Sequence, residues 1–174
     1  RRAAEREYRI LERLEHPGLL RVDTLSPTDR GPALVFRWYE DAQRLDHYLA
    51  AQKGELPAHV TLGILRQIAD AIAYAHRRKV VHRALSPQSI LVRPAAEGEV
   101  PEVKIFNWQL GLIDGTNTQG SSTRISQSLH AGQLVEDESI VYLAPEAVAG
   151  QTLEGEEIDS FSMGALAYRL FSGL

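Results

Sequence analysis

The stretch His82-Arg83-Ala84-Leu85-Ser86-Pro87-Gln88-Ser89-Ile90-Leu91 decides the fold of this 174-residue chain. It leads into the apolar run Ile90-Leu91-Val92, and a second run, Val103-Lys104-Ile105, follows after a loop that contains proline and glycine. Two short β-rich runs around such a loop predict a small hairpin. A second informative stretch, Lys104-Ile105-Phe106-Asn107-Trp108-Gln109-Leu110, begins inside the second run.

Three segments with helical periodicity surround this hairpin. Residues 2–14 place apolar side chains three and four positions apart, which predicts an amphipathic helix that His16-Pro17-Gly18 ends. Residues 58–78 repeat apolar side chains at the same spacing and predict a helix with one buried stripe. Residues 159–171 are apolar or small on nearly every side, so we expect this helix in a core that chain beyond residue 174 completes.

The remaining segments predict short strands, turns and loops. Leu19–Val22 and Ala33–Phe36 are typical of strands, with turn chemistry at Ser26–Pro32 between them. A short helix is expected around Leu45–Ala51. Residues 113–128 are almost all Gly, Ser, Thr, Asn and Gln, which predicts a mobile loop because little of it can be buried.

Composition excludes several functional classes. A net charge of −4 gives no electrostatic case for nucleic acid, and the basic cluster 77–79 is interpreted as a solvated helix end. The absence of cysteine excludes disulfides, thiolate metal sites and thiol nucleophiles. Neither a signal peptide nor a run long enough to cross a bilayer is visible, so we expect a cytoplasmic protein. The abundance of Ala and Arg indicates a bacterial source.

The stretch at 82–91 resembles the catalytic loop of eukaryotic-type serine/threonine protein kinases, and the stretch at 104–110 resembles their magnesium-binding segment. In this resemblance, four positions that carry the chemistry of the family hold other residues. They are Ala84 for the base aspartate, Ser86 for the lysine, Ser89 for the metal-binding asparagine and Asn107 for the metal-binding aspartate.

The resemblance continues along the chain, from the family's C helix at residues 7–17 to its F helix, which begins at 159. It makes Glu7 the glutamate that pairs with the nucleotide-binding lysine, and Phe36 the gatekeeper at the start of the adenine-contacting hinge. The nucleotide-binding candidates are therefore Glu7, Phe36, Arg37, Trp38, Tyr39 and Leu91. The residues with implied structural roles are His82, Arg83, Trp108, Glu146 of the Ala-Pro-Glu element, and Asp159.

The resemblance implies an α+β, protein-kinase-like fold. Residues 1–38 would form a partial N-terminal lobe with the C helix and strands four and five of the family. Residues 39–174 would form a partial, mainly α-helical C-terminal lobe, truncated after the F helix, with a mobile activation-type loop at about 110–141. The glycine-rich loop and the lysine would precede Arg1.

The substituted positions cannot supply what phosphoryl transfer requires. The reaction depends on a base and on two magnesium ions that are held by anionic oxygen ligands. The Ala84 methyl group accepts no proton, Asn107 offers a neutral amide oxygen, and Ser89 is short and uncharged. We therefore expect no catalytic residue, no metal site and no required cofactor. Magnesium is not expected, whereas ATP binding through the hinge stays open.

The expected function is that of a catalytically inactive pseudokinase, which acts as a regulatory or protein-interaction module with a protein partner. The alternative is a degenerate serine/threonine kinase with residual ATP binding and weak transfer to protein hydroxyls. A helical interaction protein unrelated to kinases would require residues 90–106 to be helical. The oligomeric state is left open.

Overall fold

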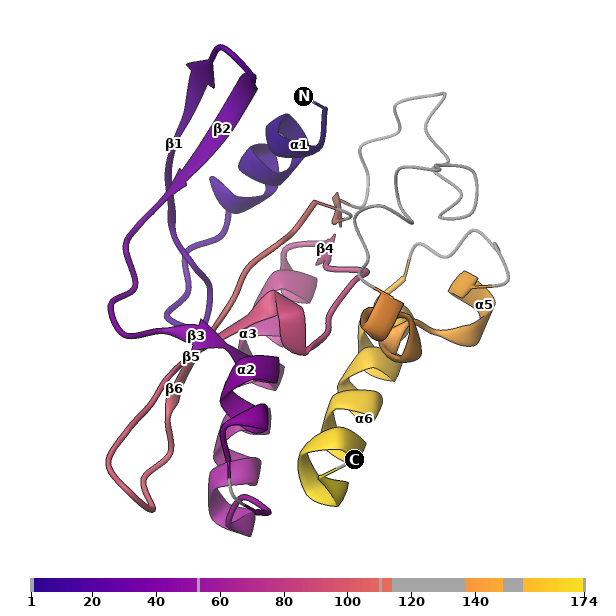
Figure 1. Cartoon of the computed structure of the whole chain (residues 1–174). Coiled ribbons are helices and arrows are strands. Elements are labelled where there is room, and N and C mark those ends of the chain that lie inside the picture. Colours follow the sequence, from indigo (N-terminus) through magenta and orange to yellow (C-terminus); the bar gives the residue numbers. More distant parts are fainter. Residues whose placement is uncertain (1, 53, 110, 114–136, 149–154, 174) are drawn as a thin grey trace.

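The computed structural model describes residues 2–52, 54–109, 111–113, 137–148 and 155–173. Helices and small antiparallel sheets alternate along these ranges (Figure 1), which confirms the α+β class. Within the same ranges, no helix combines the length and the apolar character that a membrane span needs.

The first part of the chain packs a helix against a hairpin. α1 (Arg2–Leu11) lies beside β1 (Val22–Thr28) and β2 (Gly31–Phe36), as Figure 1 shows. Ile10 and Leu11 bury the inner face of the helix. The expected helix at 2–14 therefore forms but ends three residues early, and its continuation is a hydrogen-bonded turn.

The hairpin is longer than the sequence pattern predicts. β1 begins at Val22 instead of Leu19, and its pairing with β2 continues through most of the segment 26–32 that was expected to be a turn. Pro27 and Pro32 face each other in register. Proline lacks the N–H that a strand ladder uses, so a pair near the end of a hairpin costs little and does not stop the strands.

The larger part is built on α3 (Ala58–Arg77), which bears out the long helix expected there. The three-stranded sheet that packs against it has the order β3-β5-β6, with β3 at Gln43–Arg44, β5 at Ile90–Arg93 and β6 at Glu102–Ile105. β5 and β6 are the hairpin predicted at 90–92 and 103–105. Because residues 90–93 and 102–105 are strands, a helical protein unrelated to kinases is excluded.

Short elements complete the described part. They are α2 (Leu45–Ala50), β4 (Val80–Val81) paired with β7 (Leu112–Ile113), 3₁₀ helices at Pro87–Ser89 and Asp137–Tyr142, α5 (Pro145–Val148) and α6 (Glu157–Ser172). The loop expected at about 110–141 begins with β7 and ends with a 3₁₀ helix. Its middle, residues 114–136, lies outside the described residues.

The two parts of the chain share backbone hydrogen bonds. Leu19, which is not in β1, forms a parallel bridge with Ile105 of β6. Ile105 N donates to Gly18 O at 2.8 Å, and Lys104 Nζ donates to Pro17 O at 2.8 Å. The segment after α1 is thereby joined to the sheet of the larger part.

The core follows one stripe of α3 and the surfaces that pack on it. α6 contributes a second helix, one face of which is buried. Its sequence predicts a core helix whose other faces further chain would cover. Phe161, Tyr168 and Phe171 are 42%, 65% and 50% exposed. The buried apolar side chains of α3 and α6 are Val60, Ile64, Ile68, Ala71, Ile72, Ala75, Ile158, Leu166 and Leu170.

Gln67 fixes the β5–β6 hairpin to α3. Its Oε1 accepts from Val103 N at 3.1 Å, and its Nε2 donates to Pro101 O at 2.8 Å. The same hairpin places Val100 over Gly63, where a Cβ atom would meet the Val100 side chain at 2.4 Å. A glutamine and a glycine of one helix thus set the position of the strand that leads into Asn107.

We expect Gln67→Ala to lower the free energy of unfolding by about 1–3 kcal/mol, since a partly buried backbone N–H loses its acceptor. Arg66→Ala is the matched control, because the Arg66 side chain is 85% exposed and such changes stay within about 0.5 kcal/mol. Urea denaturation followed by circular dichroism measures both. Equal midpoints for the two variants would contradict this role of Gln67.

Candidate functional site

Asp159, in the first turn of α6, anchors the stretch that begins at His82. Its side chain is fully buried. Its Oδ2 accepts from His82 N and its Oδ1 from Arg83 N, both at 2.8 Å. His76 Nε2 lies 2.8 Å from Oδ2 as a third partner. The carboxylate therefore fixes two consecutive backbone amides, one of them at Arg83, whose positive φ of 70° is costly for a non-glycine residue.

His76 is a site residue that the sequence reasoning missed. It lies in the last turn of α3, and its Nδ1 is 3.6 Å from Glu156 of the turn before α6. The available signal was a polar, titratable residue in a helix end that leads directly into His82. Sequence alone could not show that Asp159, 83 positions away, would be its partner.

His82 and Trp108 form a buried pair that joins the two informative stretches. Both side chains are fully buried, and their rings meet edge to face with centroids 4.5 Å apart. His82 Nε2 lies 3.0 Å from Phe106 O. Burial lowers the pKa of His82, against the opposing effects of Asp159 and the Phe106 carbonyl. The neutral imidazole therefore packs as a structural group.

Ser89 stands at the position of the family's metal-binding asparagine. Both hydrogen-bonding functions of its hydroxyl group are taken by Ser86 of the same loop. Its Oγ accepts from Ser86 N at 2.9 Å and donates to Ser86 O at 2.9 Å. The Ser86 hydroxyl in turn donates to Gln88 Oε1 and accepts from the Ser139 hydroxyl, each at 3.4 Å. Ala84, half-buried in the same loop, adds only a methyl group. The loop is closed by its own hydroxyl groups, and Gln88 and Ser139 are contacts that the sequence did not indicate.

Glu7 reaches the second stretch from α1. Its carboxylate, 2% exposed, accepts from Trp108 N at 2.8 Å. Burial raises the pKa of Glu7, while hydrogen bonds from the Trp108 and Asn107 amides oppose the shift. Asn107 itself has a φ of 63°, a conformation that asparagine tolerates better than most residues. The candidates Glu7, Asn107, Trp108, His82 and Asp159 are thus connected by contacts.

The candidates for the nucleotide-binding hinge do not take part in the contacts that connect Glu7 with Asp159. Phe36 is half-buried against the core, whereas Trp38 is 83% exposed. Arg37 binds Asp23 through two hydrogen bonds of 2.9 and 3.1 Å on the surface. Leu91 is a half-buried residue of β5.

Tyr39, the last hinge candidate, lies among charged side chains of the β5–β6 hairpin. Arg93 and Lys104 lie over its ring at 5.1 and 4.9 Å, and its hydroxyl donates to Glu102 O at 3.4 Å. Burial, together with the negative charge of Glu102, raises the pKa of Tyr39 to about 12. Glu146 lies half-buried in the first turn of α5, and none of these contacts reaches it.

Among the residues that the structure describes, the site does not offer the oxygen ligands that a pair of magnesium ions needs. The two buried carboxylates of the site, Glu7 and Asp159, already accept hydrogen bonds from backbone amides. Both Ser89 hydroxyl functions are used by Ser86, and Asn107 is neutral. Hard divalent cations need several anionic or well-placed oxygen ligands, and the hydrogen bonds of these side chains leave few such oxygens unengaged.

The description "protein kinase domain" fits a family model that matches residues 1–174. The chain belongs to the protein kinase domain family. Its mixed α and β structure agrees with a partial kinase-like fold. Whether this member of the family transfers phosphate is a separate question, because the family shares a scaffold while the reaction depends on particular residues.

Named relatives of this kinase-family chain are kinases of very different organisms. It is 30% identical to "Probable kinase PglW" of Streptomyces coelicolor, over 98% of this chain and 12% of that protein. It is 25% identical to "Serine/threonine-protein kinase pkn2" of Myxococcus xanthus, over 97% of this chain and 19% of that protein. It is 29% identical to the "Carbon catabolite-derepressing protein kinase" of Secale cereale, over 98% of this chain and 30% of that protein. The chain thus spans less than a third of the length of each of these relatives.

Asp159→Ala is expected to lower the free energy of unfolding by about 3 kcal/mol or more, because two buried backbone amides lose their acceptor. Glu157→Ala provides the control, since Glu157 lies in the same helical turn but is exposed. Hydrogen exchange should show loss of protection at residues 82 and 83 in Asp159→Ala alone. Unchanged protection there would contradict the anchoring role.

Glu7 should make stability depend on pH. The pKa of Glu7 is higher in the folded protein than in the unfolded chain, so folding favours the protonated carboxyl group. The stability that this preference contributes is fully present at pH values below the unfolded pKa. It is lost as the pH rises through the pKa of the folded protein. Glu7→Gln keeps an acceptor for Trp108 N without a charge. We expect it to flatten the pH dependence above about pH 4.5 and to be at least as stable as the natural protein at neutral pH.

Urea titrations between acidic and neutral pH check this, with Glu12→Gln as the exposed control. Lower stability of Glu7→Gln than of the natural protein at neutral pH would contradict the prediction.

Proposed function

We propose that this domain is a catalytically inactive pseudokinase that acts as a regulatory or protein-interaction module. The observation that carries the proposal is the joint substitution at Ala84, Ser89 and Asn107. The base and both metal-ligand positions are affected at once. In addition, Ser89 is engaged by Ser86 and is therefore unsuited to a metal ion.

The expected loss of rate is large. Absence of the base alone costs about 10²–10⁴-fold. Loss of the metal ions removes several kcal/mol of charge stabilisation as well, although the two effects need not add. Kinases of this type turn over at about 1–100 s⁻¹, so either loss leaves little activity.

The scaffold contacts support retention of a folded surface without the reaction. Asp159 still fixes the amides of His82 and Arg83, and Glu7 still reaches Trp108. These contacts need neither nucleotide nor metal. A domain that keeps its supporting carboxylates while it lacks its reactive ones is suited to binding a protein partner.

A second candidate is a degenerate serine/threonine kinase with residual, magnesium-independent ATP binding. Its support is that the relatives are named as kinases and that the substitutions leave the hinge candidates Phe36 to Tyr39 untouched. Under the first proposal no cofactor is required. Under the second, ATP would bind through hinge backbone, with weak transfer to protein hydroxyls. A cytoplasmic location and a bacterial source remain predictions under both.

The two candidates differ in a transfer assay with labelled ATP and a thermal-shift titration with ATP, with and without magnesium, on the full-length protein. We expect no transfer and no magnesium effect. The triple reversion Ala84→Asp, Ser89→Asn, Asn107→Asp should introduce magnesium dependence into the thermal shift. Ala95→Asp, which adds a carboxylate on an exposed loop, should not. If the natural protein transferred phosphate and Leu91→Trp abolished this transfer, the second candidate would be established.

A further inference from the structure

The segment that follows α1 meets the end of α3 at a group of aromatic rings and cations. The centroid of the His16 ring lies 4.8 Å from that of the Tyr74 ring. The guanidinium group of Arg78 lies over the same tyrosine, 3.7 Å from its centroid. Lys104 of β6 reaches this segment, because its Nζ donates to Pro17 O at 2.8 Å. The junction cluster consists of His16, Tyr74, Arg77, Arg78 and Lys104.

The backbone of this segment is held in place before any ligand binds. Glu15 N donates to the Tyr74 hydroxyl at 3.0 Å. Gly18 packs directly on α3, where a Cβ atom would meet the Cβ of Ala71 at 2.9 Å. Gly18 N donates to His16 Nδ1 at 3.1 Å, so the neutral ring carries its proton on Nε2. That N–H has no acceptor among the described residues, and a ligand can use it.

Positive charge surrounds the His16 ring. Burial is the main cause that lowers the pKa of His16. The charges of Arg77, Arg78 and Lys104 add to this effect, and only the carboxylate of Asp70 opposes it. Cations from two segments of the chain, the end of α3 and β6, therefore act on one half-buried ring.

Two of these positive charges have no partner of opposite charge. Asp70 and Lys104 each have one, an arginine at 4.0 Å and a glutamate at 3.3 Å. In the part of the chain that the structure describes, neither Arg77 nor Arg78 pairs with a carboxylate, and both are exposed. A phosphorylated serine or threonine carries a matching charge of about −1.5 to −2 at pH 7. Guanidinium groups bind phosphate through parallel hydrogen bonds.

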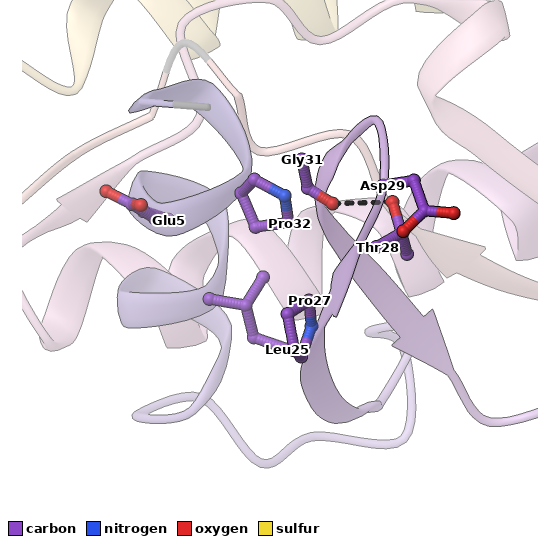
Figure 2. A pocket seen from close by; sticks show the side chains of 7 residues that line it. All are labelled: Glu5, Leu25, Pro27, Thr28, Asp29, Gly31 and Pro32. Atoms are coloured by element: carbon purple, nitrogen blue, oxygen red, sulfur yellow. Dashed lines mark hydrogen bonds between the residues drawn. The ribbon is translucent and has the colours of Figure 1, made fainter.

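A small anion suits this surface better than an extended one. Glu12, Glu15 and Asp70 expose carboxylates on the same elements, and the chain has a net charge of −4, so nucleic acid or an anionic membrane would be repelled. The groove between α1 and the β1–β2 hairpin offers an anion no alternative, because Glu5 and Asp29 line it and its lining contains no cation (Figure 2).

We propose that the junction cluster binds a phosphorylated serine or threonine side chain on a segment of a partner protein. The guanidinium groups of Arg77 and Arg78 donate to phosphate oxygens, and His16 Nε2 adds a neutral donor beside them. Lys104 adds to the positive potential from β6. The proposal names a class of partner for the interaction role proposed above. It does not depend on the loss of phosphate transfer, so either proposal can fail without the other.

Microscale thermophoresis on the full-length protein tests the proposal with three peptides. Each has the sequence GGA-X-AGG, where X is phosphoserine, serine or glutamate. We expect the phosphoserine peptide to bind at least about five-fold more tightly than either of the others, because it alone carries about two negative charges on one side chain. Equal affinity of the phosphoserine peptide and either other peptide would overturn the proposal. Absence of binding by the phosphoserine peptide would do the same.

Substitutions then locate the binding. The double variant Arg77→Gln, Arg78→Gln should weaken the phosphoserine peptide about three- to thirty-fold. Arg77→Gln alone, which leaves Arg78 over Tyr74, should weaken it by a smaller factor. Arg30→Gln removes an exposed cation from the turn between β1 and β2 and should change nothing. If the double variant bound as tightly as Arg30→Gln, the peptide would bind elsewhere and the proposal would fail.

Two further measurements complete the test. Thermal unfolding midpoints of the variants should equal that of the natural protein, because all the substituted arginines are exposed. Vesicles of phosphatidylserine are the last probe, and we expect them not to bind. Vesicle binding that the double variant abolishes would assign the cluster to a membrane surface and overturn the proposal.

Discussion

The buried carboxylate of Asp159 is the constraint on which the rest of the site depends. It accepts hydrogen bonds from the consecutive amides of His82 and Arg83 and lies within hydrogen-bond distance of His76. A buried charge is tolerated only when such partners compensate its desolvation. The first turn of α6, the end of α3 and the start of the catalytic-type loop are therefore held together by one side chain.

In this arrangement, the residues that hold the site together are different from the residues that would act on a nucleotide. In the loop after His82, the residues that would act on a nucleotide are replaced by alanine and serine, and the serine hydroxyls hydrogen-bond within the loop. The supporting contacts of His82, Trp108 and Glu7 are all present. Selection for a folded binding surface would maintain the second set without the first, which is the physical content of the pseudokinase proposal.

Sequence reasoning located the elements well where periodicity and local chemistry decide them. α3, the β5–β6 hairpin and the helix at α6 lie where their patterns predict. It was wrong for the β1–β2 hairpin, because turn-forming residues such as Pro27 and Pro32 were interpreted locally, whereas cross-strand pairing extends through them. For α6 the pattern predicted a core helix, and the described residues bury one face of it, because a hydrophobic pattern does not say which part of the chain covers each face.

For the candidate site, too, the sequence predicts some features and not others. The motif positions could be read from the sequence, since a resemblance assigns them one by one. The partners could not: His76 meets Asp159, and Ser139 meets Ser86, through contacts that only the folded chain brings together. Likewise, nothing in the local sequence showed that the Ser89 hydroxyl would turn back onto its own loop.

The shared backbone bonds between residue 18 and β6 have a mechanical consequence. Gly18 and Ile105 are joined as neighbouring strands are, and Lys104 adds a side-chain tie to Pro17. A clamshell opening of the two parts would have to break these bonds. Because Trp108 N also donates to Glu7 of α1, the helix and the segment that follows it are both joined to the larger part, and we expect the two parts to move together.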